Sequence, residues 1–74
     1  MIKVEFTDTF NSEDNFFAIC KELGLKYKKD PNYERHYAGC NAPNVGYIVY
    51  TNDYKAIRSR ACRNRYVENL MLYD

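Results

Sequence analysis

Basic side chains are concentrated between positions 55 and 65 of this chain. Five of its eleven Lys and Arg residues lie there: Lys55, Arg58, Arg60, Arg63 and Arg65. Guanidinium groups form paired hydrogen bonds with carboxylates and phosphates, so such a cluster suits an acidic protein surface or a nucleic acid. Arg stems that simply cover aromatic core, with their charged ends paired to acidic residues of another helix, would give the same pattern. The cluster therefore indicates a binding surface without identifying the partner.

Residues that could carry catalysis or hold a metal are few. The chain has a single His, His36, so any pair of a nucleophile and a histidine base must use it. His36 and Cys40 are four residues apart, a spacing seen at metal sites, but two ligands do not complete a site. Only three Gly are present, and none forms part of a phosphate-binding loop motif. We therefore expect a protein that is not an enzyme and that holds no metal and no cofactor.

The overall charge and the cysteines point to a cytoplasmic protein. The net charge of +1 creates no general attraction for nucleic acid, although every Arg lies at position 35 or later. Three Cys, an odd number, do not make a disulfide framework. The first residues alternate in polarity, unlike a signal peptide, and no apolar run is long enough to cross a bilayer. We expect reduced thiols and no membrane association.

Two helices are predicted, and the second carries the basic cluster. The first spans 12–23, because its apolar residues recur at helical spacing and Gly24 suits the position after a helix: Phe16, Ile19, Cys20 and Leu23. Asn11 or Ser12 would cap its start. The second helix spans 53–65, after capping residues at Asn52 and Asp53, and places Lys55, Arg58 and Arg63 on one outward face.

Strands are predicted around these helices. Ile2, Val4 and Phe6 alternate with polar residues, which is typical of a strand with one buried face. Segments 25–29 and 33–40 are extended, either as one strand interrupted at Asp30 to Asn32 or as a hairpin. Segments 45–51 and 66–73 complete the set. The order β-α-β-β-α-β in 74 residues predicts one α+β domain over 1–74 with a ferredoxin-like, four-stranded antiparallel sheet and two helices on one face.

The sheet face without helices is expected to be free for partners. In the third strand, either Tyr47 and Val49 or Gly46, Ile48 and Tyr50 point outward, so at least one Tyr would be exposed there. RNA-recognition domains stack bases on aromatic residues of this strand, but the segment 44–50 lacks their basic residue and paired aromatics. Tyr47 and Tyr50 are therefore candidate contacts for a protein partner.

These observations favour a small binding protein that modulates or inhibits a macromolecular partner. The partner expected first is a protein with an acidic surface. Nucleic acid bound by the second helix and a homodimer formed through sheet edges or faces are the alternatives. A composition with eight Asn and eight Tyr, and with Lys dominating the first half, fits a product of a phage or mobile element that acts on a host system.

Overall fold

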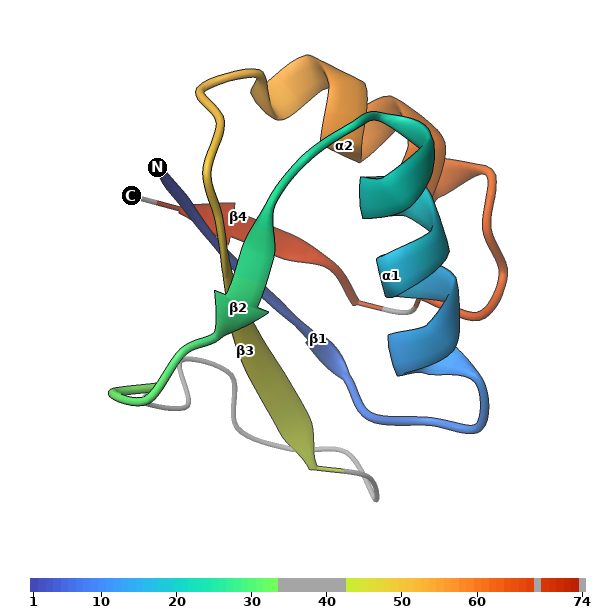
Figure 1. Cartoon of the computed structure of the whole chain (residues 1–74). Coiled ribbons are helices and arrows are strands. Elements are labelled where there is room, and N and C mark those ends of the chain that lie inside the picture. The colour runs from blue at the N-terminus through green and yellow to red at the C-terminus, as the bar shows by residue number, and fades with distance from the viewer. Residues whose placement is uncertain (34–42, 68, 74) are drawn as a thin grey trace.

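The part of the chain that the structure describes forms a four-stranded antiparallel sheet and two helices, in the order predicted. The structure, a computed structural model, describes residues 1–33, 43–67 and 69–73. The elements are β1 (Ile2–Thr7), α1 (Ser12–Glu22), β2 (Tyr27–Lys29), β3 (Asn44–Val49), α2 (Tyr54–Cys62) and β4 (Met71–Tyr73). The strand order is β2-β3-β1-β4, with β1 and β3 at the centre (Figure 1). The predicted ferredoxin-like arrangement is confirmed.

Both helices pack on one face of the sheet and share one core. The alternation in β1 turns Ile2, Val4 and Phe6 toward the helices, and each of these side chains is fully buried. Aromatic rings fill the space under α1, where Phe16 lies 5.1 Å from the ring centres of both Phe6 and Tyr47. Cys20 is buried in the same cluster, as expected of an apolar helix position.

Helix α1 begins at Ser12 and ends just before Gly24, close to the predicted bounds, but its start lacks a side-chain cap bond. Gly24 takes a φ of 68°, and the amides of Gly24 and Leu25 donate to the carbonyls of Lys21 and Cys20. These two bonds form a Schellman motif. Glycine is favoured at its left-handed position because it has no Cβ to clash with the backbone. At the other end Asn11 occupies the N-cap position with a φ of 67° and makes no side-chain cap bond. Instead, the Ser12 hydroxyl bonds both the amide and the carbonyl of Thr9.

Helix α2 and strand β4 are shorter than predicted. The prediction of helix through 65 is wrong because Asn64 Oδ1 accepts the Tyr66 amide at 2.9 Å, and this local bond competes with helical hydrogen bonds. The prediction of strand from 66 is also wrong, since residues 63–67 form turns and Asn69 has a φ of 55°. Of the described residues in the predicted strand 66–73, only Met71–Tyr73 pair with β1. Of the predicted extended segment 33–40, only Tyr33 belongs to the described residues.

The centre of the helix-free sheet face is covered, which corrects the expectation that this face is open. Glu5, on β1, is 0 % exposed although it points away from the helices. The Tyr33 hydroxyl donates to one Glu5 carboxylate oxygen at 2.5 Å, and Asn44 Nδ2 donates to the other at 3.3 Å. The Tyr33 ring lies against Gly46, where a Cβ would overlap it. Gly46 therefore makes room for the ring that helps to bury Glu5.

The ends of the chain lie side by side. Lys3 of β1 is paired with Tyr73 of β4. The first strand therefore begins beside the place where the last, antiparallel strand ends (Figure 1). Within the described residues, neither helix has the length and apolar character needed to cross a lipid bilayer.

Candidate functional site

Helix α2 displays the basic cluster because its other face is buried. The Asp53 carboxylate accepts the Ala56 amide at 3.1 Å and caps the first turn. Ile57 and Ala61 pack in the core, which turns Lys55 and Arg58 toward solvent. The predicted outward face of this helix is therefore present at its first two basic positions.

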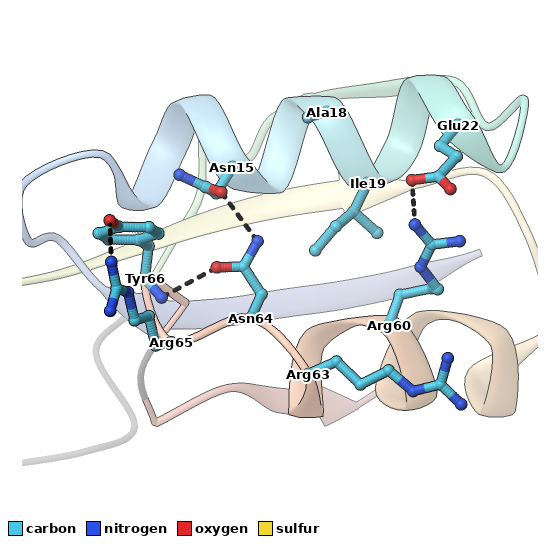
Figure 2. Close-up of a pocket in the computed structure, with 9 residues that line it drawn as sticks. All are labelled: Asn15, Ala18, Ile19, Glu22, Arg60, Arg63, Asn64, Arg65 and Tyr66. Carbon is cyan, nitrogen blue, oxygen red and sulfur yellow. Dashed lines mark hydrogen bonds and ion pairs between the residues drawn. The ribbon is translucent and has the colours of Figure 1, made fainter.

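Arg60 is the exception, because it joins the two helices. Its guanidinium donates to the carboxylate of Glu22, at the end of α1, and forms an ion pair with it (Figure 2). The hydrogen bond from Arg60 holds the pKa of Glu22 below its usual value. Both side chains are partly exposed, so salt screens the pair and it adds little to stability. The alternative to a binding role, in which the charged end of an Arg pairs with Glu13, Asp14 or Glu22 of the first helix, therefore describes Arg60.

The turn after α2 holds Arg65 in place. Asn64 Nδ2 donates to Asn15 Oδ1 of α1 at 2.9 Å, and Asn64 Oδ1 accepts the Tyr66 amide. The Arg65 guanidinium lies 5.0 Å from the centre of the Tyr66 ring and donates to the Tyr66 hydroxyl at 2.9 Å. A guanidinium above an aromatic face is attracted by the ring and keeps its remaining donors for another group. Arg65 is therefore an oriented but exposed cation.

A groove of about 610 Å³ runs between the two helices and the turn, and we call it the interhelical groove. Its lining comes from α1, from α2 and from the turn after α2: Asn15, Ala18, Ile19, Glu22, Arg60, Arg63, Asn64, Arg65 and Tyr66. In Figure 2, Arg60 and Arg63 lie near one end, Arg65 and Tyr66 lie at the other, and Ile19 is between them. The groove thus has a cationic group at each end, and between them lie the apolar Ile19 and the hydrogen-bonded amides of Asn15 and Asn64.

A second hollow, of about 310 Å³, lies beside the first. Arg58 and Arg65 line it together with Cys62, an exposed free thiol, and the apolar residues Val67 and Leu70. Arg65 borders both hollows. We call the four exposed cations of α2 and its following turn the basic surface: Lys55, Arg58, Arg63 and Arg65. Among the described residues, no carboxylate pairs with any of the four.

The two candidate tyrosines lie away from the interhelical groove. Tyr47 faces the helices and is 4 % exposed, and its hydroxyl donates to the Glu13 carboxylate. Burial, together with this bond, raises the pKa of Tyr47 well above its ordinary value. Of the two orientations left open for β3, the structure has the one with Gly46, Ile48 and Tyr50 on the helix-free side. Tyr50 is 48 % exposed just after β3, near the start of α2, whereas Arg63 and Arg65 follow its end.

The sequence pattern did not reveal the polar residues that shape the groove. Asn15 and Asn64 are 49 positions apart, so no local spacing relates them. Tyr66 directly follows Arg65, but adjacent side chains face each other only in a turn, and this segment was predicted as strand. The signal that could have found them is the Asn at position 64, a residue that favours local backbone hydrogen bonds over a continuing helix.

No metal-binding cluster forms among residues 1–33, 43–67 and 69–73: nowhere there do three or more His, Cys, Asp or Glu side chains come together in a way that could hold an ion. His36 and Cys40 lie outside these ranges. Comparisons of the chain with protein families, with curated proteins and with solved structures give no match.

Proposed function

We propose that this chain is a non-enzymatic binding protein that attaches to an acidic surface of a protein partner through the basic surface. The observation that carries the proposal is the set of four exposed cations on α2 and its following turn, which pair with no described carboxylate. Free guanidinium groups next to shallow hollows can bind carboxylates in pairs of hydrogen bonds. Such a surface also speeds the encounter with an acidic partner.

The charge distribution favours protein over nucleic acid as the partner. The net charge is only +1. Nucleic-acid binding depends on accumulated positive charge, which a nearly neutral chain lacks, whereas an acidic patch on a protein needs only a local cluster of cations. The further proposal of a phage or mobile-element product that inhibits a host protein in the cytoplasm is supported by composition alone.

An affinity pulldown from bacterial lysate, with and without nuclease, tests the proposal. The wild-type chain is compared with Arg58→Glu/Arg63→Glu and with Lys28→Glu/Lys29→Glu. The second variant makes the same charge change at exposed positions of β2, away from α2. A protein retained after nuclease, lost with the α2 variant and kept with the β2 variant is the expected result. That captured protein, once purified, should also bind the purified chain directly.

Other outcomes decide against the proposal. Equal loss in both variants would show that only net charge matters, and bound material that disappears with nuclease would favour the nucleic-acid alternative. Neither pair of substitutions touches a described hydrogen bond, so both variants should unfold at the wild-type urea concentration. A shifted unfolding midpoint would disqualify that variant and require single substitutions.

Self-association through β4 is a second candidate, favoured by the unequal edges of the sheet. Edge strands present unpaired backbone groups that other strands can bind, and lysine side chains discourage such pairing. Strand β2 carries the exposed Lys28 and Lys29, whereas β4 consists of Met71, Leu72 and Tyr73. Among the described strands, only β1 pairs with β4.

Sedimentation at increasing concentration tests this candidate. If β4 mediates a dimer, Met71→Lys should restore the monomer, because Met71 is exposed and a charged edge resists pairing. Lys28→Met on β2 is the matched control and should leave the mass unchanged. A monomer at the highest concentration would remove this candidate.

A further inference from the structure

We infer that the interhelical groove binds a short segment of the partner protein in which apolar side chains are flanked by acidic ones. This inference rests on the proposed function, and it specifies which part of the molecule the partner occupies and what chemistry it brings.

The end at Arg65 is already ordered for a carboxylate. Asn64 ties the turn to α1 through Asn15, and Tyr66 supports the Arg65 guanidinium from its ring and its hydroxyl. Binding usually costs the entropy of fixing a long basic side chain, and this cost is smaller where the guanidinium is already held. The donors of Arg65 that Tyr66 does not use remain for a carboxylate of the partner.

The end at Arg60 offers two guanidinium groups against one carboxylate. Glu22 accepts from Arg60, and Arg63, which borders the same groove, has no ion pair among the described residues. A partner carboxylate here would therefore complete a local charge balance of two cations and two anions. This charge complementarity selects an acidic occupant.

The middle of the groove distinguishes a protein segment from a nucleic acid. The exposed Ala18 and the nearly buried Ile19 of α1 line it, beside the hydrogen-bonded Asn15 and Asn64. An aliphatic side chain of the partner would cover Ala18 and the remaining exposed part of Ile19 and remove that apolar surface from water. A phosphate backbone would instead place charge over Ile19, which is unfavourable.

Three synthetic peptides test the inference by fluorescence anisotropy with the full chain. The first has the sequence Glu-Glu-Leu-Leu-Glu-Glu, the second has Ser in place of Leu, and the third has Gln in place of Glu. We expect the first to bind and the other two to bind at least about tenfold more weakly, since each lacks one half of the proposed chemistry.

Variants of the chain locate the contact. Arg63→Gln and Arg65→Gln should each weaken binding of the first peptide about tenfold, because each removes a charged hydrogen-bond donor. Ala18→Phe should weaken it as strongly, because the larger ring occupies space in the groove between its two ends. Arg58→Gln is the control, since Arg58 belongs to the basic surface but does not line this groove. It should change the affinity less than about twofold.

Several results would overturn the inference and leave the proposed function intact. These are no binding of the first peptide up to about 1 mM, equal binding of the Ser peptide, or equal losses for Arg58→Gln and Arg63→Gln. Tighter binding of a single-stranded oligonucleotide of thymidines than of the first peptide would also overturn it. The pulldown with Arg58→Glu/Arg63→Glu can still succeed in the first three cases, so failure of the groove and failure of the basic surface are distinguishable.

Discussion

Glycine at position 46 is required by a ring on the sheet rather than by a turn. The space above Gly46 is filled by Tyr33, whose hydroxyl bonds the buried Glu5. Gly46→Ala should therefore lower the free energy of unfolding by about 1 to 3 kcal/mol, as overpacked cores do. Urea unfolding of Gly46→Ala with and without Tyr33→Ala measures this. In the Tyr33→Ala background the same substitution should cost little, because the added methyl group has room.

Gly24→Ala provides a contrast at the other glycine among the described residues. No atom lies within 4 Å of a Cβ built there, but the backbone has a φ of 68°. We expect a cost of about 1 kcal/mol from the left-handed conformation, whether or not Tyr33 is present. If Gly46→Ala lowered the free energy of unfolding equally with and without Tyr33, as expected for Gly24→Ala, the loss would come from backbone conformation and not from the Tyr33 ring.

Cys20 should make stability depend on pH in the alkaline range. Burial raises the pKa of the thiol from 9.0 to about 11. Below pH 9 the thiol is protonated in both states, while between pH 9 and pH 11 only the unfolded chain loses the proton, so stability falls as pH rises. Since each pH unit is worth 1.36 kcal/mol, the fall is about 2 to 3 kcal/mol. Urea unfolding across this range measures it.

Cys20→Ala is the control for that dependence. It should be less stable than wild type at neutral pH, because it removes a buried group. Its stability should fall less between pH 9 and pH 11, and the difference between the two curves belongs to the thiol. Parallel curves would show that other groups cause the alkaline loss.

At the scale of elements, the two helices begin by different means. Asp53 caps α2 with its carboxylate, whereas Asn11 precedes α1 without a side-chain cap bond and with a φ of 67°. Asp53→Ala should therefore destabilise the protein by about 1 kcal/mol. Asn11→Gly should be neutral or slightly stabilising, because glycine adopts this φ readily. Thermal unfolding followed by circular dichroism compares them, and a larger loss for Asn11→Gly would contradict the assignment of the caps.

The elements show how far the sequence pattern reaches. Apolar spacing around Phe16 and Ile19, the Gly after α1 and the alternation in β1 are local signals, and they predicted the order of elements and thus the fold. The ends of α2 and β4 were not predictable from spacing, because Asn64 and Asn69 redirect the backbone through local bonds and a positive φ. The covered sheet face was missed because Tyr33 and Glu5 are 28 positions apart.

The candidate site was predictable only in part for the same reason. Helical periodicity placed Lys55 and Arg58 on the surface, as the structure does. It could not show that Arg60 would reach α1, or that Arg65 would rest on Tyr66, since both contacts depend on how the helices pack. The groove is a property of the assembled molecule.

For the molecule as a whole, charge sets a limit on nucleic-acid binding. If all four cations of the basic surface contacted phosphates, the logarithm of the binding constant would fall with the logarithm of salt concentration with a slope of about −3.6. We expect a short DNA duplex to bind no more tightly than non-specific complexes do, with a slope no steeper than this. Titration at several salt concentrations measures it. A steeper slope or nanomolar affinity would place the nucleic-acid alternative first.

The pairing of β1 with β4 has a consequence for how this chain can be rebuilt. Because Lys3 and Tyr73 are partners, a short linker between the two ends would close the backbone into a ring without disturbing the sheet. Closure restricts the unfolded chain, so the circular form should melt at a higher temperature. The ring could then be reopened after α1, beside Gly24, to give a permuted chain with the same interhelical groove.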